Sequence, residues 1–128
     1  GVGYVHEDGS LDVVDRLKDM VIRGGENVYG AEVEAAIVEH PDVLEVAIIG
    51  LPEEHMGERV CAVVVQRPGT EITLDDIRDF TSSRLAYFKQ PEALFIAGEL
   101  PRTATAKIDK LTLRTNVLDT ADRIERTY

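Results

Sequence analysis

Apolar side chains recur along this chain in two patterns, one of which predicts strands and the other helices. Short runs rich in Val and Ile between turn residues favour β-strands. Apolar residues spaced three and four apart favour helices that bury one face. The predicted strands are a hairpin over residues 3–14 and single strands over 19–23, 43–51, 59–66 and 91–97. The predicted helices cover residues 30–39, 73–85 and 110–119.

Turn and capping residues mark the ends of these elements. Two glycines open a predicted loop over residues 24–27, and Thr73 with Asp76 three residues later has the pattern of a capping box. The last helix has a weak apolar stripe, made of Leu111, Thr115 and Leu118. Because strands and helices are mixed without strict alternation, we expect an α+β fold. Its small mixed sheet would include the N-terminal β-hairpin, with about three helices packed on it.

Composition narrows the class of protein. The chain has 128 residues, enough for one domain, and 14 Lys and Arg against 24 Asp and Glu give a net charge of −10. This charge argues against binding nucleic acid or an anionic membrane, and no apolar run reaches the length of a membrane span. The single Cys61 lies in a strand-like run and is expected to be a buried small hydrophobe. Nothing indicates secretion, so we expect a cytoplasmic protein. The chain begins with Gly rather than Met, which suggests a piece of a longer protein.

Three segments could carry chemistry. The first is the alternating charges of residues 15–19, the second the glycine loop 24–27, and the third the segment 101–110, in which small residues surround Lys107. From residue 102 to 114, four cations and one anion give a local charge of +3 on an acidic chain, which suits one small anion. Each segment alone is also compatible with an ordinary solvated turn. The three histidines show no metal-ligand spacing, so no metal site is expected.

Taken together, these segments resemble the signatures of a known family. They read VDRLKDMVI from Val14, GGENV from Gly24 and LPRTATAKIDK from Leu100, with YVHEDG upstream from Tyr4. This order and spacing, over about residues 1–114, resembles the adenylate-forming ligases: acyl-CoA synthetases, luciferases and peptide-synthetase adenylation domains. Two long motifs in register are far more specific than either alone.

The resemblance implies a domain organisation and a reaction. Residues 1–128 look like the small, mobile C-terminal lid domain of such a ligase. Nothing in the sequence resembles the large N-terminal domain that holds ATP and the acyl group, which would be the chief partner of this chain. In that family a carboxylate attacks ATP with Mg²⁺ present and gives acyl-AMP and pyrophosphate. The small domain then rotates, and a thiol, usually of coenzyme A, takes the acyl group.

The resemblance also assigns roles in the adenylation step. Lys107 matches the lysine that neutralises charge during adenylation, Arg16 matches an arginine that contacts the ribose, and Lys18 matches the hinge. Ala106 stands where the family usually has glycine. If the backbone there needs a positive φ, alanine costs about 1 kcal/mol; alternatively, the loop adopts a negative φ.

Other matches concern thioester formation. Gly24, Gly25 and Glu26 match the loop that lines the pantetheine channel, and Phe88 and Lys89 match a stretch that helps to bind the nucleotide of coenzyme A. The Gly-Gly-Glu-Asn sequence is common in fatty- and aryl-acid ligases. The leading interpretation is therefore the C-terminal domain of an acyl-CoA synthetase that acts on a fatty or other apolar carboxylic acid. The alternatives are an acyl-AMP ligase that delivers to a carrier protein, and a non-catalytic binding module with the same fold.

Overall fold

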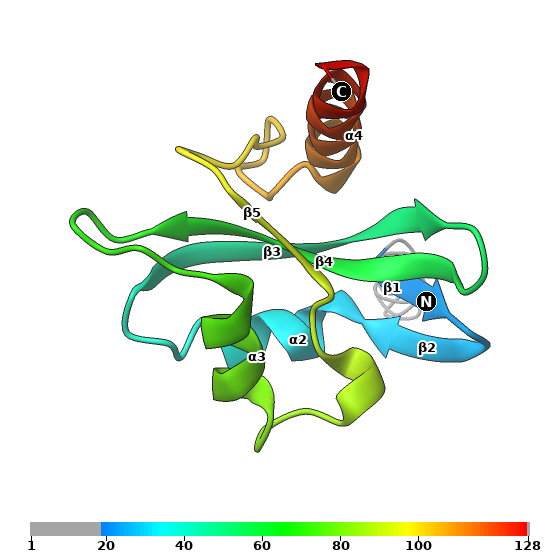
Figure 1. Cartoon of the computed structure of the whole chain (residues 1–128). Helices are drawn as coiled ribbons and strands as arrows, with labels where there is room; N and C mark the ends of the chain where they lie inside the picture. Colours follow the sequence, from blue (N-terminus) through cyan, green and yellow to red (C-terminus); the bar gives the residue numbers. More distant parts are fainter. Residues whose placement is uncertain (1–18, 128) are drawn as a thin grey trace, which may run out of the picture.

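The structure is a computed structural model that describes the backbone of residues 19–127 and the side chains of residues 19–120. The hairpin predicted over residues 3–14, and also Arg16 and Lys18, lie outside the described residues. The described residues form five strands: β1 (Met20–Arg23), β2 (Glu26–Tyr29), β3 (Val43–Glu53), β4 (Gly57–Gln66) and β5 (Ala93–Ile96). The helices are α2 (Gly30–Ile37), α3 (Leu74–Thr81), the short 3₁₀ helix η1 (Tyr87–Lys89) and α4 (Lys110–Thr127). The α+β class is confirmed (Figure 1).

The β3–β4 hairpin forms the centre of one mixed sheet. The strand order is β2-β1-β4-β3, all antiparallel, and β5 adds to β4 in parallel. The two long strands pair from Val43 with Gln66 to Glu53 with Gly57, so each runs two residues further than predicted and only residues 54–56 remain between them. Pro52 can sit inside β3 because β3 is the terminal strand of the sheet, where a missing N–H breaks no ladder bond.

The glycine loop is also shorter than predicted. Residues 24–27 are not all loop, because Glu26 and Asn27 belong to β2 and pair with Arg23 and Ile22. Only Gly24 and Gly25 form the turn, with φ angles of 58° and 82°. Positive φ at both central residues suits a two-residue hairpin, since the twist of such a turn matches the twist of the strands.

The sheet is buried on both faces, which explains the continuous apolar runs of β3 and β4. Alternate residues of these strands, such as Ile48 and Val64, pack with α2 and α3 in one core. The residues between them, such as Ile49 and Val63, pack with α4 in a second core. Figure 1 shows α4 above the sheet and α2 and α3 below it. Cys61 is fully buried in the second core, which confirms the prediction.

Two helices differ from their predicted form. The capping box of α3 is present, with Thr73 and Asp76 each accepting the other's backbone N–H, but the helix ends at Thr81 rather than at residue 85. The stripe predicted for α4 is only partly right: Leu118 packs against the second core, but Leu111 is 77% exposed and Thr115 is exposed, whereas Leu113 and Val117 are buried there. A weak periodicity does not determine the rotation of a helix; packing against the sheet does. No helix among the described residues has the length and apolar character to cross a membrane.

Candidate functional site

Residues 101–109, here called the lysine loop, form a small hairpin between β5 and α4. The amide of Asp109 donates to the carbonyl of Pro101 over 2.8 Å, and the amide of Thr103 donates to the carbonyl of Lys107 over 2.7 Å. The amide of Ala106 closes the tip by donating to the carbonyl of Thr103 over 2.9 Å. The backbone of the loop is therefore ordered by its own hydrogen bonds, although the loop carries only small and polar residues at its tip.

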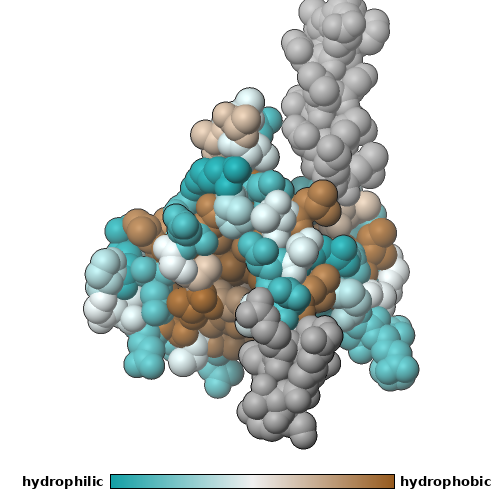
Figure 2. Space-filling view, turned by 90° about the horizontal axis from the view of Figure 1, so that it is seen from above, coloured by the Kyte–Doolittle hydropathy of each residue, from teal (hydrophilic) through white to brown (hydrophobic). Residues whose placement is uncertain are grey.

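Lys107 lies on the outward side of this hairpin. Its side chain is exposed, whereas the next residue, Ile108, is half-buried and packs on the core beneath α4. The following Asp109 accepts the N–H of Thr112 over 3.1 Å and so caps the start of α4. The lysine is thus carried on a loop anchored on its C-terminal side. In Figure 2, which views this face from above, hydrophilic and apolar side chains are intermingled.

Ala106 adopts the conformation that glycine would favour. Its φ angle is +67°, the left-handed region. Of the two alternatives left open by the sequence, the structure thus has the positive φ, which costs an alanine about 1 kcal/mol relative to glycine. The strain lies in the residue directly before Lys107.

The glycine turn is tied to the end of the long hairpin. The amide of Gly24 donates to the carbonyl of Met56 over 2.7 Å. A Cβ at Gly24 would lie 2.4 Å from Cε of Met56, whereas a Cβ at Gly25 would meet nothing within 4 Å. Glu26, which follows the turn, is exposed. The tip therefore presents bare backbone at Gly25.

The two residues matched to coenzyme A binding lie in η1. Phe88 is half-buried and packs against the core formed with α2 and α3. The ammonium of Lys89 lies 2.9 Å from a carboxylate oxygen of Glu32, so this cation is engaged with an acidic residue of α2. Any anion that binds Lys89 has to compete with Glu32.

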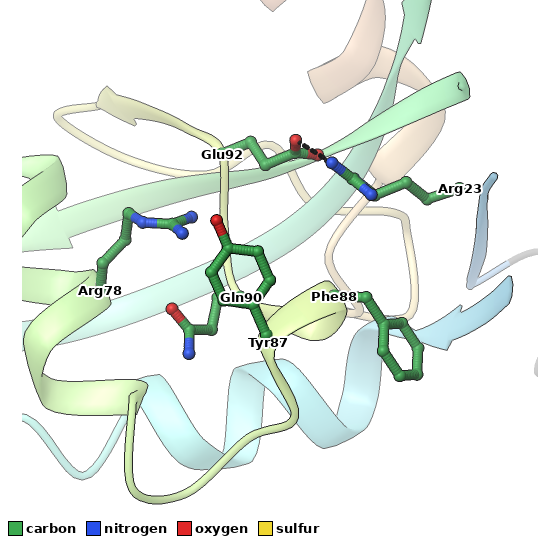
Figure 3. A pocket seen from close by; sticks show the side chains of 6 residues that line it. All are labelled: Arg23, Arg78, Tyr87, Phe88, Gln90 and Glu92. Atoms are coloured by element: carbon green, nitrogen blue, oxygen red, sulfur yellow. Dashed lines mark hydrogen bonds and ion pairs between the residues drawn. The ribbon is translucent and has the colours of Figure 1, made fainter. Parts of the chain in front are cut away.

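A shallow pocket joins the base of the glycine turn to η1 (Figure 3). It has a volume of about 40 Å³ and is lined by Arg23, Arg78, Tyr87, Phe88, Gln90 and Glu92. Arg23, the residue before the turn, binds the carboxylate of Glu92 with two hydrogen bonds of 2.5 and 2.6 Å. The hydrogen bond from Arg23 is the main cause that lowers the pKa of Glu92, and the same bond raises the pKa of Arg23.

The structure therefore separates the predicted site residues into two groups. The glycine turn and η1 come together through the pair of Arg23 and Glu92, on the side of the sheet that carries α3. The lysine loop lies with α4 on the opposite face. Across the described residues, no group of three His, Cys, Asp or Glu side chains could hold a metal ion.

Comparison with known proteins agrees with this architecture. The family described as AMP-binding enzyme C-terminal domain matches residues 32–107. The chain is 41% identical over 109 residues to the oxalate–CoA ligase of Arabidopsis thaliana, covering 85% of this chain and 21% of that protein. It is 45% identical over 113 residues to the long-chain-fatty-acid–CoA ligase FadD13 of Mycobacterium tuberculosis, covering 88% and 22%.

Solved structures give the same result. A fatty acyl CoA synthetase of Mycobacterium tuberculosis superposes with a TM-score of 0.76 at 44% identity, over 82% of this chain and 21% of that one. ATP-bound MatB from Rhodopseudomonas palustris superposes with a TM-score of 0.74 at 39% identity, over 77% and 20%. Fold and comparisons together define the C-terminal domain of an adenylate-forming ligase. The chain belongs to the AMP-binding enzyme C-terminal domain family, and it spans about a fifth of the length of these relatives.

Proposed function

We propose that this chain is the lid domain of a longer, ATP-dependent acid–thiol ligase. In this proposal the full-length ligase activates a carboxylic acid, in our view a fatty acid, as acyl-AMP and transfers the acyl group to coenzyme A. The relatives from Arabidopsis thaliana and Mycobacterium tuberculosis are named as CoA ligases, which supports coenzyme A as the acceptor. The observation that carries the proposal is the exposed Lys107 on an ordered loop of a chain that covers only a fifth of those ligases.

In the first step, Lys107 supplies positive charge. A carboxylate oxygen of the acid attacks the α-phosphorus of ATP, and the bond to pyrophosphate breaks. Negative charge builds up on the α-phosphoryl oxygens and on the attacking carboxylate, and a compact ammonium can neutralise both. The acyl pocket, ATP and Mg²⁺ are held mainly by the N-terminal domain in this proposal. An exposed lysine can reach them from outside, which a buried one could not.

In the second step, the other face of the domain turns to the site. The thiol attacks the carbonyl carbon of the acyl-AMP, and AMP leaves. The bare backbone at Gly25 would line the pantetheine channel, and Phe88 and Lys89 would lie near the nucleotide of coenzyme A. Arg16 as ribose contact and Lys18 as hinge stay predictions. The separation of the two groups across the sheet supports a domain that presents two faces in turn.

The test is to measure the two half-reactions separately in the full-length ligase. Lys107→Ala is expected to lower ATP–pyrophosphate exchange by about 100- to 1,000-fold. The same variant should form thioester from preformed acyl-AMP at close to the normal rate. Equal losses in both half-reactions would remove Lys107 from this role. The isolated 128-residue chain should show no ATP–pyrophosphate exchange, and measurable exchange would contradict the proposed division of labour.

A further inference from the structure

Arg102 holds the lysine loop at two points. Its Nη1 donates a hydrogen bond of 3.1 Å to the carbonyl oxygen of Ala106. Its Nη2 donates to the carboxylate of Glu45 on β3, with which it also forms an ion pair. A guanidinium presents its donors in fixed directions within one plane. Through Arg102, Glu45 on the sheet therefore restricts where the Ala106 carbonyl can lie.

That carbonyl belongs to the peptide group that joins Ala106 to Lys107. Because a peptide group is planar, the orientation of this carbonyl also fixes the direction of the Lys107 N–Cα bond. The peptide group on the other side of Lys107 is held as well, since its carbonyl accepts the amide of Thr103 over 2.7 Å. Both groups that determine where the Lys107 side chain emerges are thus hydrogen-bonded.

The contacts of Arg102 contribute little to the stability of the fold. The side chains of Arg102 and Glu45 are 44% and 34% exposed. Ion pairs in such positions are worth about 0–1 kcal/mol, because water screens them. An exposed pair that crosses from a loop to a strand 57 residues earlier acts mainly on the geometry of the loop. The geometry that it sets is that of the strained Ala106 and of Lys107.

We propose that Arg102 and Glu45 are positioning residues for Lys107. This inference rests on the proposed function of Lys107 in adenylation. Glu45 orients the guanidinium, the guanidinium orients the Ala106 carbonyl, and the ammonium of Lys107 is thereby kept in the direction that reaches the α-phosphate. Small misplacements of a reacting group can cost about 100-fold in rate. The thioester step, which uses the other face, should not depend on this contact.

The experiment compares four variants of the full-length ligase in the two half-reactions. Arg102→Gln removes the bond to the carbonyl and the ion pair, Arg102→Lys keeps only the charge, and Glu45→Gln releases an intact arginine. Arg84→Gln is the matched control, because Arg84 is also exposed and also donates to a backbone carbonyl, that of Phe80. Arg84 lies beyond α3, on the opposite side of the sheet from the lysine loop.

We expect Arg102→Gln to lower kcat of ATP–pyrophosphate exchange by about 10- to 100-fold, with little change in KM for ATP. Arg102→Lys should lower kcat as much as Arg102→Gln, because a compact ammonium lacks the fixed, planar array of donors with which the guanidinium joins the Ala106 carbonyl to Glu45. Glu45→Gln should also lower kcat of the exchange, but by less than Arg102→Gln does. Thioester formation from preformed acyl-AMP and the melting temperature should stay unchanged in all variants, as should exchange in Arg84→Gln. If Glu45→Gln leaves exchange intact while Arg102→Gln abolishes it, Arg102 acts directly on substrate and the proposal fails.

Combination with Lys107→Ala separates positioning from other effects. If Arg102 acts only through Lys107, adding Arg102→Gln to Lys107→Ala should slow exchange by less than about 2-fold more. A further loss as large as in the wild-type background would overturn the positioning role. A Lys107→Ala variant with normal exchange would instead overturn the proposed function itself, so the two failures can be told apart.

Discussion

The ammonium of Lys110, the first residue of α4, lies 2.7 Å from a carboxylate oxygen of Glu34 on α2. The two helices lie on opposite faces of the sheet (Figure 1). The same oxygen of Glu34 accepts the backbone N–H of Ile48 on β3 over 2.8 Å. Lys110 also pairs with Asp19, directly before β1. One cluster therefore joins both faces of the domain.

The cluster also protects the terminal strand. Ile48 and Gly50 are two residues apart, so their backbone groups point to the same side of β3. Glu34 accepts the N–H of Ile48, and Arg114 of α4 donates to the carbonyl of Gly50 over 2.8 Å. Side chains from both helices thus occupy backbone groups that an exposed edge would offer to another strand.

Lys110→Met is expected to lower the free energy of unfolding by about 1–2 kcal/mol, because Asp19 and Glu34 would share a site without their cation. Urea denaturation of the chain measures this. Lys89→Met is the control, since its partner Glu32 is 46% exposed and the pair is worth less. Equal losses in the two variants would contradict the central position of Lys110.

Ala106→Gly should stabilise the chain by up to about 1 kcal/mol, because glycine has no penalty at a φ of +67°. Part of this gain is offset by the greater freedom of glycine in the unfolded state. Ala104→Gly is the matched control in the same loop: its φ is not positive, so the substitution should destabilise. Thermal melts of both variants check the prediction, and a destabilised Ala106→Gly would contradict it.

The pair of Arg23 and Glu92 should make stability depend on pH. The pKa of Glu92 lies below its ordinary value of 4.5, chiefly because of the hydrogen bond from Arg23. The contribution is therefore complete above pH 4.5 and is lost as the pH falls through the lower, folded-state pKa. Glu92→Gln should cost about 1–2 kcal/mol at pH 7 and less at pH 3. Glu99→Gln, which removes an exposed carboxylate, should change urea midpoints little at either pH.

Cys61 should be inert in the folded chain. Burial raises the pKa of its thiol to about 12, so at pH 8 only about one thiol in ten thousand is ionised. Iodoacetamide at pH 8 is expected to leave the native chain unmodified and to add one group after unfolding in urea. Mass spectrometry distinguishes the two states. Rapid modification of the native chain would show that the second core opens easily.

The two glycines of the turn should respond differently to alanine. Both have positive φ, so each substitution costs about 1 kcal/mol in backbone strain. Gly24→Ala should cost only slightly more than Gly25→Ala, because its Cβ would lie 2.4 Å from Cε of Met56, the end of an exposed, flexible side chain that can move aside. At Gly25 a Cβ would meet nothing within 4 Å, so Gly25→Ala should lower the free energy of unfolding by no more than the backbone strain. The same substitution should slow thioester formation in the full-length ligase if Gly25 lines the pantetheine channel. Normal thioester formation by Gly25→Ala would contradict that placement.

Local signals predicted much of the fold. Runs of Val and Ile located β3 and β4, Thr73 and Asp76 located the start of α3, and the strand-like surroundings of Cys61 indicated its burial. Each of these depends on residues close together in sequence. The extent of the glycine loop was wrong, because strand pairing drew Glu26 and its neighbour into β2.

The amino-acid sequence by itself determined the class of fold, the family and the loop that carries Lys107, since periodicity, turn chemistry and two long motifs are all local patterns. Only the tertiary structure decided which face of α4 is buried, the left-handed backbone of Ala106 and the contact of Arg102 with Glu45. The burial of α4 and the contact of Arg102 with Glu45 arise from packing between segments as much as 57 residues apart. No local pattern encodes such contacts, because they exist only once the sheet has brought the segments together.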